Sequence, residues 1–129
     1  MKEELIKEAL EAMENAYAPY SHFKVGAAIL TENGNIYSGC NVENASFGAT
    51  ICAERNAATT AIAKEGKVRF KAIAIASMPE NPAPPCGICR QFLSEFTDVE
   101  APVYLVSSVS GKTKEFSFGA LMPELFTEF

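Results

Sequence analysis

The sequence predicts an α/β fold, a three-layer α-β-α domain around a five-stranded mixed sheet. Helical and strand patterns alternate along the chain in the order αββαβαβ(β)α, which is typical of layered α/β domains. Residues 72–76 are an unbroken apolar run, as expected for a strand that is buried on both faces. A length of 129 residues, with 48% hydrophobic and 21% charged residues, predicts a single domain over residues 1–129.

The first part of the chain is expected to form a helix and then a β-hairpin. Apolar residues recur there at helical spacing, at Leu5, Ile6, Ala9, Leu10, Met13 and Tyr17. They predict an amphipathic helix over residues 2–16 that ends before Pro19. Residues 23–31 and 35–41 have strand patterns on either side of Asn33-Gly34, a pair that favours a hairpin turn because it tolerates positive φ.

The second part of the chain continues the alternation after these strands. A helix is expected from Cys52 to about Lys64, with Gly66 as its stop. A Pro-rich loop over residues 79–85 follows the buried strand and leads into a helix with an apolar stripe, formed by Ile88, Phe92, Leu93 and Phe96. The remaining elements are a strand at residues 102–107, a weaker strand at 113–118, and a helical or irregular tail from Leu121 onward.

Charge and hydropathy exclude several classes of function. The chain has 11 basic and 16 acidic residues, a net charge of −5, and no basic cluster of the kind that binds nucleic acid. Its start does not resemble a signal peptide, and no apolar run approaches the roughly 20 residues that a membrane span needs. We therefore expect a cytoplasmic protein with no nucleic-acid or membrane partner, whose four cysteines serve as metal ligands or catalytic thiols.

The cysteine spacing indicates a metal site. Cys86 and Cys89 lie three positions apart, on one side of a helix or turn, and suit one tetrahedral zinc. Thioredoxin-like redox sites share this spacing but usually follow the first strand of their fold. Cys52 and Glu54 are two positions apart, so they can serve one site only if Cys52 lies in the first turn or at the cap of its helix. The helical pattern places Cys52 there.

Three thiolates would leave zinc with an open position, as in catalytic rather than structural sites. They would also give the site a net negative charge, which weakens the acidification of a bound water. The positive ends of two helices favour the thiolates. Arg55, next to the site, can donate hydrogen bonds to the sulfurs and offset the same charge.

Four segments, in order, resemble the motifs of the zinc-dependent cytidine deaminases within the cytidine/deoxycytidylate deaminase family. They are residues 20–27, 39–44, 52–55 and 85–92. The short chain and the all-cysteine ligand set are similar to the homotetrameric branch, whereas the longer dimeric branch has His at the position of Cys52. The resemblance implies hydrolytic deamination of free cytidine and deoxycytidine to uridine and deoxyuridine in pyrimidine salvage, with release of ammonia.

The resemblance also implies roles for individual residues. Cys52, Cys86 and Cys89 would hold one Zn²⁺ per chain, and Glu54 would shuttle protons while zinc-bound hydroxide attacks C4 of the base. The implied substrate contacts are Asn41 and Glu43 to the ribose, Phe23 and the backbone of Ala53 to the base, and Phe126 in a neighbouring subunit's site. The implied homotetramer fits an Ala-rich helix face, formed by Ala53, Ala57, Ala58 and Ala61.

Other interpretations stay open at this point. A related deaminase that acts on another aminopyrimidine, such as blasticidin S, would carry the same zinc motif. A non-catalytic module could close a Cys₄ site with Cys40, or use a redox dithiol. Asn41 could simply cap a turn, and Phe23 and Phe126 could be packing residues. His22 is expected to be an exposed loop residue and not a ligand.

Overall fold

Five strands form one mixed sheet in the order β2-β1-β3-β4-β5 in the computed structural model, which describes residues 1–127. The strands are β1 (Val25–Thr31), β2 (Ile36–Cys40), β3 (Phe70–Ser77), β4 (Pro102–Ser107) and β5 (Thr113–Ser117). Strands β3 and β4 run parallel, whereas the other neighbouring pairs are antiparallel. The predicted five-stranded mixed sheet is therefore confirmed.

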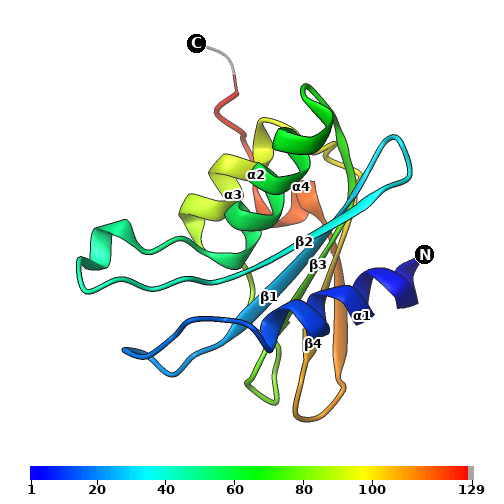
Figure 1. Cartoon of the computed structure of the whole chain (residues 1–129). Coiled ribbons are helices and arrows are strands. Elements are labelled where there is room, and N and C mark those ends of the chain that lie inside the picture. The colour runs from blue at the N-terminus through cyan, green and yellow to red at the C-terminus, as the bar shows by residue number, and fades with distance from the viewer. Residues whose placement is uncertain (128–129) are drawn as a thin grey trace.

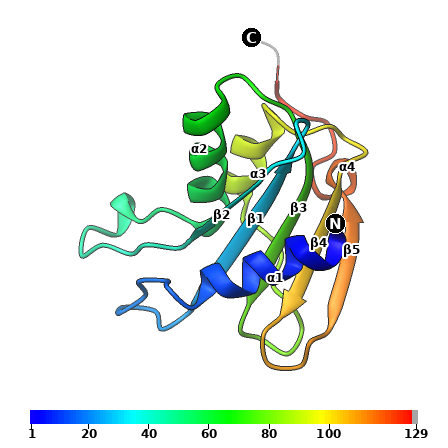
Figure 2. The same cartoon turned by 45° about the vertical axis from the view of Figure 1, so that its right-hand side comes forward.

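Helices cover both faces of this sheet. They are α1 (Lys2–Met13), α2 (Ala53–Glu65), α3 (Gly87–Ser94) and α4 (Phe118–Leu121), with a short 3₁₀ turn at Phe47–Ala49. Helix α1 lies on one face, and α2 and α3 lie side by side on the other (Figures 1 and 2). This arrangement confirms the predicted three layers. None of the helices in the described part of the chain combines the length and apolar character that a membrane crossing requires.

Several boundaries differ from the sequence prediction, and the strand predicted from residue 23 begins at Val25. Helix α1 ends at Met13 rather than at residue 16, because the amides of residues 14–16 bond to carbonyls three residues back and tighten the chain into a turn. The last helix, α4, begins at Phe118, before the expected tail. Its start is capped by the hydroxyl of Ser117, which accepts a hydrogen bond from Ala120 N–H.

The core has one cluster on each face of the sheet. Leu5, Ala9 and Met13 of α1 pack against one face, and α2 packs against the other. Strand β3 is buried on both faces apart from Lys71, as its apolar run predicted. The alanine face of α2 is also fully buried inside the chain. The expectation that this face serves contacts between subunits is therefore wrong, because the chain's own sheet covers it.

The apolar stripe predicted for α3 is only partly correct. Phe92, Leu93 and Phe96 pack on the core as predicted, although Phe96 follows the end of the helix. Ile88 is 67% exposed, although Cys89 in the same first turn of α3 is fully buried.

The predicted hairpin joins β1 and β2 around Gly34, whose φ of 87° lies in the region that glycine favours. The carboxylate of Glu65, the last residue of α2, accepts hydrogen bonds from Thr31 Oγ1, Asn33 Nδ2 and Asn35 Nδ2. The tip of the hairpin is thereby tied to one end of α2. The opposite end of α2 carries the residues of the candidate site.

Candidate metal centre and substrate cavity

Three cysteine sulfurs meet where two helices begin. Cys52 is the N-cap residue of α2, Cys86 is the N-cap residue of α3, and Cys89 lies in the first turn of α3. Their Sγ atoms all lie within 4.8 Å of one another. The structure thus brings together the three cysteines that the sequence predicted as ligands. Cys40 lies at the end of β2 and is not part of this cluster.

The surroundings of the cluster favour a thiolate at Cys52, whereas the hydrogen bond with Cys52 and burial raise the pKa of the Cys89 thiol. A hydrogen bond from the Cys89 thiol, together with the hydrogen bond and charge of Arg55, lowers the pKa of Cys52 to about 5. Arg55 Nη2 donates to Cys52 Sγ (3.7 Å) and to the carbonyl of Thr50 (3.5 Å). The N-terminal ends of α2 and α3 add positive potential. Three converging sulfurs, of which Cys52 ionises readily, fit a zinc ion with one position left open.

Glu54 is a buried carboxyl beside this cluster. It is the second residue of α2 and only 5% exposed. Removal from water is the main reason that its pKa is raised to about 7, and the charge of Cys52 adds to the effect. A glutamate on the solvent-exposed face of a helix would not show this raised pKa.

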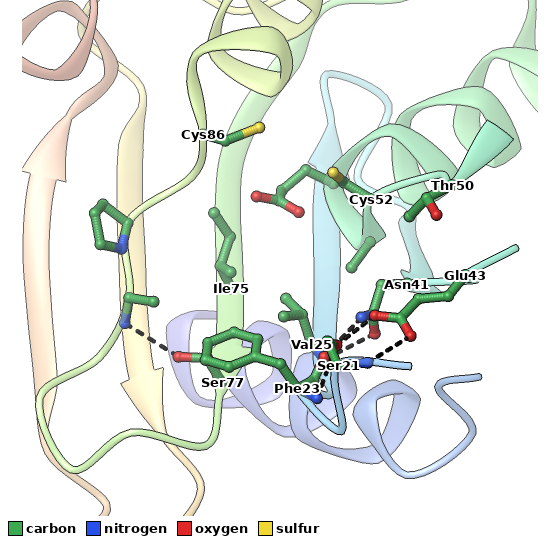
Figure 3. A pocket seen from close by; sticks show the side chains of 14 residues that line it. Ser21, Phe23, Val25, Asn41, Glu43, Thr50, Cys52, Ile75, Ser77 and Cys86 are labelled. Carbon is green, nitrogen blue, oxygen red and sulfur yellow. Dashed lines mark hydrogen bonds between the residues drawn. The ribbon is translucent and has the colours of Figure 1, made fainter. Parts of the chain in front are cut away.

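Glu54, Cys52 and Cys86 line one cavity of about 340 Å³. Figure 3 shows the two cysteines toward one end of this cavity. Ser21, Phe23, Asn41 and Glu43 lie toward the opposite end, and Ile75 lies between the two groups. The cavity is of a size that suits a small molecule. One end of such a molecule would face the sulfurs, and the other would face an amide and a carboxylate.

Asn41 and Glu43 also organise the loop that carries Phe23. Asn41 Oδ1 accepts from Val25 N–H (2.9 Å), and its Nδ2 donates to the carbonyl of Phe23 (2.8 Å). The Glu43 carboxylate accepts from the backbone N–H groups of Tyr20 and Ser21 and from the Ser21 hydroxyl. The hydroxyl contact is the main reason that the pKa of Glu43 is lowered, so this end of the cavity carries a negative charge.

The segment that carries this site matches a known protein family. The model for the cytidine and deoxycytidylate deaminase zinc-binding region matches residues 1–106.

This chain belongs to the cytidine and deoxycytidylate deaminase family.

Similar proteins cover nearly the whole chain. A cytidine deaminase of Sporosarcina psychrophila is 45% identical over 98% of this chain and 91% of its own length. A cytidine deaminase of Halalkalibacterium halodurans is 46% identical over 95% of this chain and 92% of its own length. The crystal structure of cytidine deaminase from Burkholderia pseudomallei has a TM-score of 0.91 and 43% identity, and the match covers 98% of this chain and 99% of that one.

The three-cysteine cluster of this deaminase-family chain can hold one metal ion, and the family's zinc-binding region identifies that ion as zinc. A closed Cys₄ site is not formed, since Cys40 stands apart. His22 is an exposed loop residue with a φ of 58° and does not take part in the cluster, as predicted.

The remaining predicted residues of this deaminase-family chain fall into two groups. Phe23 and Ala53 line the cavity, Phe23 partly exposed at 39% and Ala53 fully buried at the start of α2. Phe126 is 63% exposed and does not line its own chain's cavity. Its carbonyl accepts a hydrogen bond from Gln91 Nε2.

Sequence reasoning missed several lining residues of this deaminase-family cavity. They are Ser21, Val25, Thr50, Ile75, Ser77, Ala83 and Pro84. Ser77 could have been found, because it is the polar residue that ends the buried apolar strand, and sites in α/β folds gather where strands end. Ala83 and Pro84 gave no such signal, since their position depends on how the Pro-rich loop folds.

Proposed function

We propose that this chain is a zinc-dependent cytidine deaminase, which converts cytidine and deoxycytidine to uridine and deoxyuridine and releases ammonia. The observation that carries the proposal is the shared cavity, which is lined by a buried carboxyl and by two members of the three-cysteine cluster. Relatives named cytidine deaminase match this chain over almost its full length and support the same reaction.

Cys52, Cys86 and Cys89 hold the zinc in this proposal, and the position that Cys40 does not occupy stays open to substrate. When bound, zinc supplies a nucleophile by activating water at neutral pH. Arg55 donates to the Cys52 sulfur and offsets the negative charge that three thiolates create.

Glu54 moves the protons. Its carboxylate takes a proton from the attacking water and delivers it to N3 of the base. It then takes the second proton from the new C4 hydroxyl, which becomes the C4 carbonyl, and delivers it to the departing amine. A C4–O bond forms, the C4–N bond breaks, and ammonia leaves. The buried position of Glu54, in the cavity that Cys52 and Cys86 also line, supports this role.

The opposite end of the cavity binds the sugar. Asn41 and Glu43 contact the ribose, Phe23 packs against the pyrimidine, and the backbone of Ala53 contacts the base. A negatively charged Glu43 would repel a 3′-phosphate, and the chain's net charge of −5 acts in the same direction. Free nucleosides are therefore the proposed substrates, in cytoplasmic pyrimidine salvage.

We also propose that residues 1–129 are one catalytic domain that assembles as a homotetramer, in which Phe126 reaches a neighbouring chain's site. Large apolar side chains that a partner could cover support the assembly, since Phe47 is 76% and Ile88 is 67% exposed. Phe126 itself is exposed and lies outside its own cavity. Sedimentation of the purified protein would give the number of chains directly, and a monomer would contradict the assembly.

The decisive experiment is a substrate panel with the zinc-loaded protein. Cytidine and deoxycytidine should lose absorbance as they convert to uridine and deoxyuridine, with one ammonia released per nucleoside and one zinc per chain. Cytidine 3′-phosphate, the matched control for the Glu43 end, should be a poor substrate. Turnover of blasticidin S instead of cytidine would identify a related deaminase, and no turnover of any aminopyrimidine would contradict the proposed function.

A further inference from the structure

The Pro-rich loop at residues 79–85 forms one wall of the substrate cavity. Ala83 and Pro84 of this loop line the cavity. Four of its seven residues are proline, which has no backbone N–H to donate, and the loop contains no helix or strand. No backbone hydrogen bond joins two residues of this described loop, so such bonds do not set the position of the wall. Contacts from outside the loop must do so.

Ser77 supplies the first of these contacts. It is the last residue of β3, fully buried, and lines the cavity floor. Its Oγ accepts a hydrogen bond from Ala83 N–H (3.1 Å), which is drawn in Figure 3. The serine hydroxyl thus joins the end of the central strand to the wall residue that faces the substrate space.

Ser110 supplies a second contact from the turn between β4 and β5. Its Oγ donates to the carbonyl of Glu80 (3.0 Å). The turn is itself fixed to the end of β3, because Ser108 N–H donates to the carbonyl of Ser77 (2.8 Å). Buried Ser107 stiffens the turn further, since its Oγ accepts from the N–H of Ser110 (3.1 Å).

The metal end of the loop is held separately. Arg90 Nε of α3 donates to the carbonyl of Pro85 (2.8 Å), next to Cys86, and its Nη1 donates to the carbonyl of Leu121 (2.6 Å). The middle of the loop can therefore loosen while Cys86 keeps its place.

We propose that Ser77 and Ser110 are positioning residues that clamp the middle of the Pro-rich loop, and thereby hold the Ala83–Pro84 wall ready for the nucleoside. The inference rests on the proposed deaminase function. When the wall is already in place, nucleoside binding does not carry the entropic cost of ordering the loop. Loss of the clamp should weaken nucleoside binding and leave zinc and the proton shuttle intact.

The test compares Ser77→Ala and Ser110→Ala with wild type in the zinc-loaded enzyme. Each variant removes one hydrogen bond to the loop, and Ser110→Ala also removes the bond that Ser110 Oγ accepts from Lys112 N–H within its own turn. KM for cytidine should rise roughly three- to tenfold, while kcat stays within about twofold. Zinc should remain at one per chain. Ser110→Thr keeps the hydroxyl and should restore KM. The matched control is Ser108→Ala on the same turn, which keeps the backbone N–H that bonds Ser77 and should have the wild-type KM.

The outcomes separate the two proposals. An inactive wild type would contradict the deaminase function. An active wild type in which both variants keep the wild-type KM would overturn the clamp. The clamp would also be wrong if Ser110→Ala lost zinc, or lowered kcat in proportion to a lower Tm, because those effects mark a general structural defect.

A double variant sharpens the test. Two contacts that hold one loop should be coupled, because the second cannot position a wall that the first has already released. The rise in KM caused by Ser110→Ala should therefore be smaller in the Ser77→Ala background than in wild type. If the two substitutions raised KM by factors that simply multiply in the double variant, the two serines would act independently. That result would contradict a shared clamp.

Discussion

Glu54 and Arg55 are neighbours in sequence with opposite surroundings. The Glu54 carboxyl is buried in the cavity, where lost hydration raises its pKa to about 7. The Arg55 guanidinium lies against the Cys52 sulfur and the carbonyl of Thr50. One turn of α2 thus aims a carboxyl at the substrate space and a positive charge at the metal cluster.

Replacing Glu54 should stop catalysis without unfolding the site. Glu54→Gln keeps the shape of the side chain but cannot shuttle protons, so kcat should fall about 10²–10⁴-fold. Zinc content, measured per chain, should be unchanged. Glu4→Gln, an exposed carboxyl on α1, is the matched control and should keep the wild-type kcat. A Glu54→Gln enzyme with normal turnover would contradict the mechanism.

Replacing Arg55 should leave the thiolates with excess negative charge. Arg55→Ala removes a charged hydrogen bond to Cys52, so kcat/KM should fall roughly tenfold or more. Arg55→Lys keeps the charge but not the planar geometry, and we expect an intermediate loss. Steady-state kinetics with cytidine, alongside zinc analysis, would check this. Equal rates for all three proteins would show that the guanidinium does not tune the site.

The zinc cluster and Glu54 could be predicted from the sequence, because short spacing rules link Cys86 to Cys89 and Cys52 to Glu54. Residues that meet only through tertiary structure could not. Ser77 and Pro84 come from a strand end and an irregular loop, whose approach depends on hydrogen bonds between distant segments. Sequence also could not show that Asn41 is already bonded to the backbone of Phe23 and Val25.

Strand β2 and helix α2 approach each other closely through Gly39. A Cβ at this position would lie 2.5 Å from the backbone nitrogen of Ala57 and 2.9 Å from the backbone carbon of Asn56. Asn56 Nδ2 also donates to the carbonyl of Cys40 (2.8 Å). Strand β2 therefore sets the depth at which α2, and with it Glu54, lies on the sheet.

A methyl group at Gly39 should push α2 outward. We expect Gly39→Ala to lower the free energy of unfolding by about 1–3 kcal/mol, the usual cost of overpacking a core, and to lower kcat as Glu54 shifts. Denaturant unfolding and cytidine turnover would measure both effects. Gly48→Ala is the control, since a Cβ there would meet nothing within 4 Å. Equal stability of the two variants would contradict close packing at β2.

Asp98 links the start of β3 to the segment before β4. Its carboxylate pairs with Arg69 (2.9 Å) and Lys71 (2.6 Å), and the hydrogen bonds from these side chains, Lys71 first, lower its pKa. A carboxyl whose pKa is lower in the folded state than in the unfolded state stabilises the fold at pH values above its unfolded-state pKa. This stabilisation disappears as the pH falls through the folded-state value.

Asp98→Asn should therefore lower Tm at pH 7. The loss in the free energy of unfolding should be at most about 1 kcal/mol, because the ion pairs of Asp98 are partly exposed. The difference from wild type should shrink as the pH falls below about 4, where the unfolded-state carboxyl takes up its proton. Thermal unfolding between pH 7 and pH 2 would follow this. A difference that stays constant down to pH 2 would show that charge is not its source.

At the scale of the element, sequence periodicity predicted the order of helices and strands but not every end. Helix α1 stops at Met13 because its last amides turn to nearer carbonyls. Ile88 was predicted to be part of the apolar stripe, yet it is 67% exposed. Periodicity indicates which residues share a face, but only packing decides where that face is covered.

At the scale of the whole molecule, the metal cluster joins two segments that are far apart in the sequence. Cys52 opens α2, and Cys86 opens α3 after β3 has crossed the sheet. The positive potential of the two helix starts is offset by the thiolates, and a zinc ion would hold these mutually repelling thiolates together. Zinc is thus expected to stabilise the packing of α2 beside α3 as well as to serve the chemistry.

Removal of zinc should lower stability together with activity. A chelator should reduce Tm by several degrees and abolish deamination, because a ligand that binds only the folded chain stabilises it by mass action. Added zinc should restore both properties. Tm would be followed by scanning calorimetry, and Cys40→Ala, which leaves the cluster complete, should respond to the chelator like wild type. A Tm that is indifferent to zinc would show that α2 and α3 pack without it.

The hydrogen bonds at Glu65 have a practical consequence for protein engineering. Helix α2 has 13 residues, with the candidate catalytic groups at its first turn. Its last residue, Glu65, accepts hydrogen bonds from Thr31, Asn33 and Asn35 of the hairpin tip. An epitope inserted into this hairpin turn would break the hydrogen bonds to Glu65. The resulting displacement of α2 would reach the catalytic residues at its other end. The turn looks like harmless surface, but it is an unsuitable place for a label.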